Sequence, residues 1–258
     1  MAPYFEWFGQ VRTERMIDIH AHILPGIDDG ALEMKDTLEM VRMAADSGVT
    51  AMIATPHCNI PGTFENYFGE DYTERFYAVE RAVREMGLPV EIYPGMEVFA
   101  TWDLPEKMTE GKIMTLNQSH YLLMEFAFDE DPDFAREVVS RVRELGAIPV
   151  IAHAERYEFI QDDPELAYEW RREGNLIQMN KGSVLGRFGR HARRTAYQLL
   201  DRELVSVIAS DAHSPIQRTP YMLDAWEVLR RDYPEEYLRR LFEENPRCIC
   251  EDRPVHGF

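Results

Sequence analysis

Two histidines and two aspartates lie around the end of the first strand-like stretch of the chain. Apolar and polar residues alternate over residues 17–20, which is typical of a short strand. His20 and His22 share a face if the strand continues through the residue between them. Two imidazoles in that arrangement can hold one metal ion, with Asp28 or Asp29 returning from the following turn as a carboxylate ligand. A structural histidine pair is the alternative interpretation of this stretch taken alone.

The same kind of side chain recurs at the carboxyl ends of the other predicted strands. In a parallel α/β barrel those ends converge on one mouth, where active sites are built. Six of the seven predicted strands end in a histidine or an acidic residue, and chance is a poor explanation for that number. The residues are His20, His22, His57, Glu97, Glu125, His153, Asp211 and His213.

Five imidazoles and several carboxylates are more donors than one catalytic ion takes from a protein. They suit two or three ions of borderline or hard character, such as manganese, iron or zinc. A carboxylate can bridge two such ions, and a water molecule between them becomes hydroxide at neutral pH. That hydroxide is an in-line nucleophile for a phosphate ester, so the pattern indicates metal-dependent phosphoester hydrolysis.

Two arginines lie just beyond strand ends, where a substrate phosphate would bind. Arg156 follows His153 closely, and Arg218 follows His213. A guanidinium can hold phosphate oxygens bidentately and stabilise the charge of phosphoryl transfer, while a salt bridge at the rim is the alternative for each arginine. A cysteine-based phosphatase is excluded by spacing, because the position six residues after Cys58 holds phenylalanine where that chemistry needs arginine.

Short apolar strands alternate with helices along the chain, and no linker interrupts them. This alternation predicts a parallel sheet with crossover helices, and no glycine-rich nucleotide-binding fingerprint follows any strand. The count favours one α/β domain, a distorted (β/α)7 barrel of the TIM-like kind. The predicted strands lie at 17–20, 50–55, 90–93, 121–126, 148–152, 176–180 and 204–210. The predicted helices include 34–47, 71–86, 134–145, 164–174, 191–200, 222–231 and 235–244.

The composition is that of an ordinary globular protein of 258 residues, with 45% hydrophobic and 29% charged residues. The net charge of −18 argues against binding of nucleic acid or of an anionic membrane. Three cysteines are too few for a disulfide framework, so a reducing cytoplasm is expected. No apolar run reaches the roughly 18 residues of a transmembrane helix, and the start of the chain lacks the pattern of a signal peptide. We expect residues 1–15 to form an aromatic arm and residues 16–258 to form the domain.

Five stretches of the sequence occur together, in this order, in one known family. They are Asp18-Ile19-His20-Ala21-His22-Ile23-Leu24-Pro25-Gly26-Ile27-Asp28-Asp29-Gly30, Ala54-Thr55-Pro56-His57, Gly95-Met96-Glu97, Ala152-His153-Ala154-Glu155-Arg156-Tyr157 and Ala209-Ser210-Asp211-Ala212-His213. With them the chain resembles the PHP superfamily, the metal-dependent phosphoesterases named after polymerase and histidinol phosphatase. It looks most like the branch of bacterial protein-tyrosine phosphatases found in capsule and exopolysaccharide operons, whose most specific feature is the run from Pro25 to Gly30.

The resemblance implies that residues 16–258 form a PHP phosphoesterase domain with a trinuclear centre, usually assigned Mn²⁺. In this model one ion is held by His20, His22, Glu97 and Asp211. Glu97 bridges to a second ion, held by His57 and His153, and the third is completed by Asp29, Glu125 and His213. Asp28 remains an alternative to Asp29, and simple burial is the alternative for Glu125. Arg156 and Arg218 match the family's phosphate-binding arginines, and Asp211 is counted with them as catalytic.

The function implied by the resemblance is hydrolysis of phosphotyrosine on a protein by attack of a metal-bound hydroxide, without a covalent intermediate. The implied substrate is the tail of a bacterial tyrosine kinase that regulates capsular or exopolysaccharide synthesis, and the implied cofactor is two or three Mn²⁺ ions, with iron or zinc as alternatives. Two other functions stay open. The enzyme could hydrolyse a small phosphomonoester of the histidinol phosphate type, or the domain could be a non-catalytic metal-binding scaffold. The sequence leaves the oligomeric state open.

Overall fold

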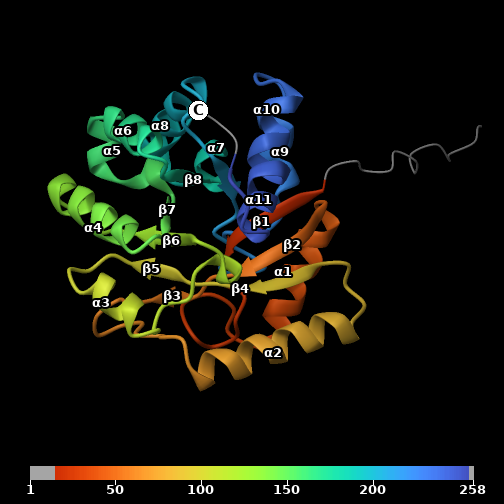
Figure 1. Ribbon diagram of the computed structural model, residues 1–258. Coiled ribbons are helices and arrows are strands. Elements are labelled where there is room, and N and C mark those ends of the chain that lie inside the picture. Colours follow the sequence, from red (N-terminus) through yellow and green to blue (C-terminus); the bar gives the residue numbers. More distant parts are fainter. Residues whose placement is uncertain (1–14, 256–258) are drawn as a thin grey trace, which may run out of the picture.

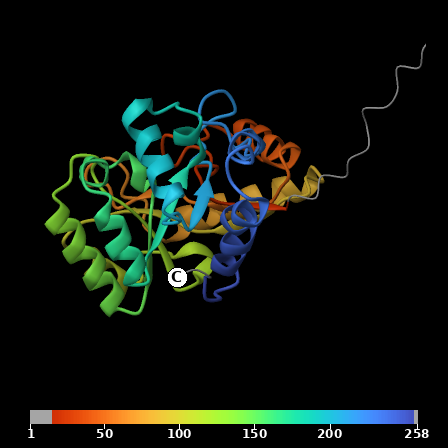
Figure 2. The same cartoon turned by 90° about the horizontal axis from the view of Figure 1, so that it is seen from above.

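The computed structural model describes residues 15–255 of the chain (Figure 1). The predicted aromatic arm, residues 1–15, lies outside the described residues except for Arg15. Helices surround a central set of strands, and this arrangement confirms the predicted α/β class (Figures 1 and 2).

Every strand pairing within residues 15–255 is parallel. One sheet has the order β1-β2-β4, and the other has the order β3-β5-β6-β7-β8-β9. The strands are β1 (Met16–Ala21), β2 (Val49–Ala54), β3 (His57–Cys58), β4 (Glu91–Pro94), β5 (Glu97–Phe99), β6 (Tyr121–Glu125), β7 (Ile148–Ile151), β8 (Leu176–Asn180) and β9 (Val207–Ala209).

Two of the seven predicted strands are each divided into two pieces. The second continues past Pro56 as β3, and the third continues past Gly95 as β5, so that β3 pairs with β5 just as β2 pairs with β4. Proline offers no backbone N–H to a ladder, which explains the first break. The seventh strand is shorter than predicted, because only Val207–Ala209 pairs with β8.

The two sheets meet where the first and last strands end. Ala21 and Ala212 form a parallel bridge, the His22 N–H donates to the Ala212 carbonyl at 2.9 Å, and the Asp211 N–H donates to the His20 carbonyl at 2.9 Å. The sheet therefore curls until β1 lies beside β9. The prediction of a single, TIM-like barrel domain with seven strand positions is confirmed.

Helices cover the outer face of the curled sheet, and the predicted long helices are all present. Their bounds are α1 (Met34–Asp46), α2 (Glu70–Glu85), α3 (Leu104–Thr109), α4 (Pro132–Glu144), α5 (Glu158–Asp162), α6 (Glu165–Arg172), α7 (Lys181–Val184), α8 (Gly189–Asp201), α9 (Leu223–Leu229), α10 (Glu235–Arg239) and α11 (Asn245–Cys250). The predicted last helix, 235–244, is longer than expected, because α10 runs through a π-helical turn, η3 (Arg240–Glu244), directly into α11.

The inner face of the sheet is apolar at one end and polar at the other. Alternate residues of β6, Tyr121 and Leu123, belong to a buried cluster that also contains Ile249 of α11. The next residue in the same alternation is Glu125, and Gln178 follows Leu176 in the same way on β8. Side chains that fill the barrel therefore give way to polar ones toward the carboxyl ends of the strands, where the predicted site residues lie.

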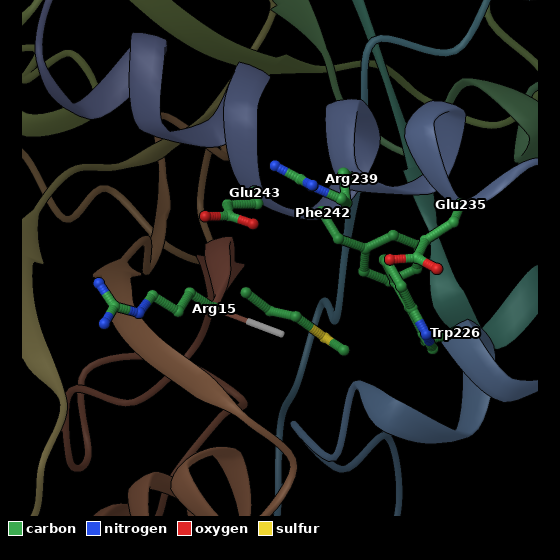
Figure 3. A pocket seen from close by; sticks show the side chains of 7 residues that line it. Arg15, Trp226, Glu235, Arg239, Phe242 and Glu243 are labelled. Atoms are coloured by element: carbon green, nitrogen blue, oxygen red, sulfur yellow. The ribbon is translucent and has the colours of Figure 1, made fainter. Parts of the chain in front are cut away.

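A separate pocket of about 330 Å³ lies near the start of β1, at the opposite end of that strand from His20 (Figure 3). It combines an apolar floor with two arginines and two glutamates. Its lining residues are Arg15, Met16, Trp226, Glu235, Arg239, Phe242 and Glu243.

Candidate metal centre

His20 and His22 project from the end of β1 toward each other. Their Nε2 atoms are 3.2 Å apart, and both side chains are fully buried. The strand extends through Ala21, whose N–H donates to the Thr55 hydroxyl at 3.0 Å. The strand therefore continues through the residue between His20 and His22, which is the condition for the two side chains to share one face.

Three histidines of the centre have the same ring nitrogen turned outward to an acceptor. Nδ1 lies 3.0 Å from Gln178 Oε1 in His20, 2.7 Å from Asp28 Oδ2 in His22, and 3.1 Å from the Asp211 carbonyl oxygen in His213. These oxygens only accept, so each Nδ1 carries the proton. When such a ring is neutral, its Nε2 presents a lone pair to the interior, as a metal ligand does.

Glu97 lies at the middle of the cluster and contacts four imidazoles. Its Oε1 is 3.2 Å from His20 Nε2 and 2.9 Å from His153 Nε2. Its Oε2 is 3.2 Å from His22 Nε2 and 3.0 Å from His57 Nδ1. Burial opposes ionisation of this carboxyl, but the His20 and His57 rings outweigh it and hold the Glu97 pKa well below its usual range.

Asp29, His57 and His213 form the outer part of the cluster. The Asp29 Oδ1 atom lies 3.5 Å from Nε2 of His57 and 3.5 Å from Nε2 of His213. Glu125, on β6, also contacts His57, and its Oε1 lies 2.8 Å from His57 Nδ1. The side chain of Asp29 is 53% exposed, so the centre opens to solvent at this point.

The two neighbouring aspartates have different surroundings. Asp28 is buried, and its carboxylate accepts from the backbone N–H groups of Gly30 and His57 as well as facing His22 Nδ1. Asp28 therefore orients a histidine and the turn that follows it, whereas Asp29 is the one that lies among the converging ring nitrogens.

The converging donors fit a group of cations. Three sets have ligand atoms within 4.8 Å of one another: His22 with Asp29, His57 and His213; His20 with His22 and Glu97; and His57 with Glu97 and Glu125. Within residues 15–255, the buried Nε2 of His213 has no hydrogen-bond partner. Lone pairs and carboxylates facing one another in a buried space repel, and cations convert that repulsion into coordination. This grouping joins Glu125 to His57 and Glu97, whereas the resemblance implied that Glu125 lies with Asp29 and His213.

Asp211 links this cluster to both predicted arginines. Its Oδ1 is 3.5 Å from Nε2 of His20 and of His22. Its Oδ2 pairs with Arg218 Nη2 and lies 3.6 Å from Arg156 Nη1. Both guanidinium groups thus point at one edge of the centre, and both remain partly exposed, 19% for Arg156 and 30% for Arg218.

Comparisons with known proteins show the family to which the chain belongs. The family model for capsular polysaccharide synthesis, CpsB/CapC, matches residues 16–251. The chain belongs to the CpsB/CapC family. It is 32% identical over 240 residues to the tyrosine-protein phosphatase YwqE of Bacillus subtilis, covering 93% of each chain. It is also 32% identical over 245 residues to the tyrosine-protein phosphatase CpsB of Streptococcus pneumoniae, covering 93% of this chain and all of the relative.

Solved structures of other proteins share the fold of this CpsB/CapC chain. A crystal structure from work on YwqE of Bacillus subtilis and CpsB of Streptococcus pneumoniae, described as unique metal-dependent tyrosine phosphatases, matches with a TM-score of 0.86 and 31% identity. The match covers 93% of this chain and 96% of the other. A phosphotriesterase homology protein from Escherichia coli, with a TM-score of 0.60 and 10% identity, shares the fold alone.

Three residues of the candidate centre have backbone angles that L-residues seldom adopt. The φ angle is 35° at His153, 51° at Asp211 and 51° at Arg218. Such left-handed positions cost of order 1–3 kcal/mol each and concentrate at functional sites. Here they redirect the chain at the point where two strands end, so that a ligand-type side chain turns inward.

Several residues that support the site in this CpsB/CapC chain were not predicted. Gln178 contacts His20, and Asn180 Nδ2 donates to Asp211 Oδ2. Both lie on the sixth predicted strand, for which the sequence predicted no site residue. Their alternation with apolar neighbours in Leu176–Asn180 was the available signal. Two aromatic contacts were also missed: Phe64 stacks on His57, and Phe128 packs on Arg156.

In the part of the chain that the structure describes, no helix is long and apolar enough to cross a membrane.

Proposed function

We propose that this CpsB/CapC family member is a metal-dependent protein-tyrosine phosphatase. The observation that carries the proposal is the convergence of five imidazoles, Glu97, Glu125 and two aspartates beside two partly exposed guanidinium groups. Relatives that match nearly the whole chain are named tyrosine-protein phosphatases, which supports the same activity here.

The metal ligands in this proposal are side chains from six of the seven strand positions. They are His20, His22, Asp29, His57, Glu97, Glu125, His153, Asp211 and His213. Divalent cations held there supply Lewis-acid activation of water and offset the charge of a phosphate. We propose two or three Mn²⁺ ions, since the donor set of imidazoles and carboxylates suits a borderline-to-hard cation, with iron or zinc as alternatives.

The residues of the chain that handle the phosphate are Arg156 and Arg218. Their guanidinium groups lie at the exposed edge of the cluster, where they can bind the non-reacting phosphate oxygens as charge develops in phosphoryl transfer. Asp211 holds both groups at that edge through Oδ2 while its other oxygen faces the histidines. The reaction then cleaves the bond between phosphorus and the tyrosine oxygen without a covalent enzyme intermediate.

We further propose that the substrate is the phosphorylated tail of a bacterial tyrosine kinase that controls capsular or exopolysaccharide synthesis, in keeping with the description of the family. We place the enzyme in the cytoplasm. Cys58, Cys248 and Cys250 are free and buried thiols, as suits a reducing compartment.

The test combines metal content with turnover on one preparation. Purified protein loaded with Mn²⁺ is expected to release phosphate from an aryl phosphate and from a phosphotyrosine peptide, and to prefer the latter to a phosphoserine peptide. A chelator should abolish the release. Equal turnover of small alkyl phosphates would favour a phosphomonoesterase of broader substrate range, and bound metal without any turnover would contradict the proposal in favour of a scaffold.

Two classes of variant separate metal binding from phosphate binding. His20→Ala is expected to lose metal and activity together. Arg156→Ala should keep the metal and lose about 10²–10³-fold in kcat/KM, as removal of a single transition-state charge donor does. His191→Ala, an exposed histidine on α8, is the control and should retain both properties. Wild-type kcat/KM for Arg156→Ala would contradict the phosphate-binding role.

A further inference from the structure

One aromatic ring lies against both arginines of the site. The guanidinium carbon of Arg156 is 4.3 Å from the centre of the Phe188 ring, and that of Arg218 is 5.7 Å from the same ring. Cation–π attraction acts within about 6 Å of a ring centre. Arg156 comes from the turn after β7 and Arg218 from the loop after β9, so Phe188 is a shared surface for two segments far apart in sequence.

The position of this ring is set by a glycine. A Cβ atom added to Gly182 would lie 2.5 Å from Phe188 Cε2, closer than real contacts allow. The ring therefore packs on the bare backbone of α7. The Arg187 N–H donates to the Gly182 carbonyl at 2.8 Å, which closes the turn between α7 and α8 and fixes the residue before Phe188.

A second ring completes the surroundings of only one arginine. The centre of the Phe128 ring lies 4.3 Å from the guanidinium carbon of Arg156, and Phe128 is 44% exposed. Arg156 is thus enclosed by two rings and a carboxylate, whereas Arg218 has Phe188 and Asp211. Long arginine side chains lose rotational freedom on binding an anion, and groups that restrict them beforehand reduce that cost.

We propose that Phe188 is a positioning residue that holds both phosphate-binding guanidinium groups in place before substrate arrives. The inference rests on the proposed function of Arg156 and Arg218. It adds that the aromatic face of Phe188, seated on Gly182, determines how tightly the site takes up a phosphate group.

The test measures binding of inorganic phosphate to the Mn²⁺-loaded protein by calorimetry, alongside hydrolysis of an aryl phosphate. Phe188→Leu keeps an apolar side chain and removes the ring. It is expected to weaken phosphate binding about tenfold and to raise KM more than it lowers kcat, with metal content unchanged. Phe188→Tyr retains the ring and should restore binding. Gly182→Ala retains every charged and aromatic group but displaces the ring, so it should reproduce the loss.

The decisive comparison is the effect of Phe188→Leu in a protein that lacks both arginines. In the double variant Arg156→Ala/Arg218→Ala, adding Phe188→Leu should change phosphate affinity less than twofold, because the ring acts through the groups already removed. Tyr77→Leu, which removes an exposed ring from α2, is the control and should bind phosphate like the wild type.

An undiminished phosphate affinity in Phe188→Leu, or an equal loss with and without the arginines, would overturn the inference. Phosphate binding is measured without turnover. An unchanged phosphate affinity in Phe188→Leu can therefore be distinguished from a failure of the proposed phosphatase activity. The second failure would appear as absent hydrolysis by the wild type.

Discussion

Gln178 makes contacts to two of the proposed ligands with one oxygen. Its Oε1 faces His20 Nδ1 at 3.0 Å and accepts the His153 N–H at 2.9 Å, while its Nε2 donates to Asn180 at 2.9 Å. The amide is fully buried and has its polar atoms matched. A single side chain on β8 therefore sets the tautomer of one histidine and the backbone of another. Such outer contacts commonly decide the affinity of a metal site.

We expect Gln178→Leu to lower metal affinity by about 10–100-fold, since His20 Nδ1 loses its acceptor and the ring its orientation. The measurement is competition with a metallochromic chelator, with thermal unfolding recorded to confirm that the variant folds. Gln198→Leu, an exposed glutamine on α8, is the matched control. Equal metal affinity of Gln178→Leu and the wild type would show that Gln178 does not position the ligand.

At the scale of elements, the divided strands bring two of the proposed ligands together. His57 begins β3 and Glu97 begins β5, and the two residues are partners in the parallel register. This pairing lies in the strand pieces that come after the breaks at Pro56 and Gly95, separate from the pairing of β2 with β4. Gly95 also permits a close approach, because an added Cβ would lie 2.7 Å from Ile53 Cγ2 and 3.2 Å from Leu116 Cδ2.

Gly95→Ala is expected to destabilise the fold by about 1–3 kcal/mol through overpacking and to displace Glu97 from the imidazoles. Urea unfolding measures the first effect and metal content the second. Gly69→Ala is the control, because its added Cβ would have only one neighbour, at 3.9 Å, and its extended backbone suits alanine. A stability equal to that of Gly69→Ala would mean that β4 and β5 shift without cost.

At the scale of the whole molecule, the proposed centre connects strands that are distant in sequence. The first and the last strand contribute His20 and Asp211, and contact between them closes the curl of the sheet. Cations bound to the folded form alone would stabilise the entire barrel by mass action. In the protein without metal, burial opposes protonation of His57 but the Glu97 carboxylate outweighs it and raises the His57 pKa to about 10.

We therefore expect Mn²⁺, kept at a fixed concentration of 100 times its Kd at neutral pH, to raise the unfolding temperature by about 5–10 °C for each site. The increase should shrink as the pH falls. Because the pKa of His57 is raised in the folded protein, the protonated ring stabilises the metal-free fold. This stabilisation is complete below about pH 6.5 and is lost as the pH rises toward 10. Metal binding, in contrast, requires the neutral ring. Calorimetric scans at several pH values measure both effects. His20→Ala should abolish the increase, and an increase independent of pH would contradict the ligand role of His57.

The parallel α/β architecture and the residue types at the strand ends could be predicted from the sequence alone. Both are local properties: apolar runs of strand length alternate with helical periods, and a parallel strand has one carboxyl end. The histidines and carboxylates proposed at the mouth were therefore predictable one strand at a time. The division of two strands at Pro56 and Gly95 was not, although both residues were visible signals.

The contacts among these side chains could not be predicted from the sequence and follow from the tertiary structure. The position of Asp29 beside His57 and His213, the contact of Glu125 with His57, and the contact of Gln178 with His20 depend on how neighbouring strands pair and on the rotamers that packing permits. His57 and Glu125 are 68 positions apart in the sequence, and His20 and Gln178 are 158 apart. No local period records these contacts, because they follow from how the sheet curls and where its two ends meet.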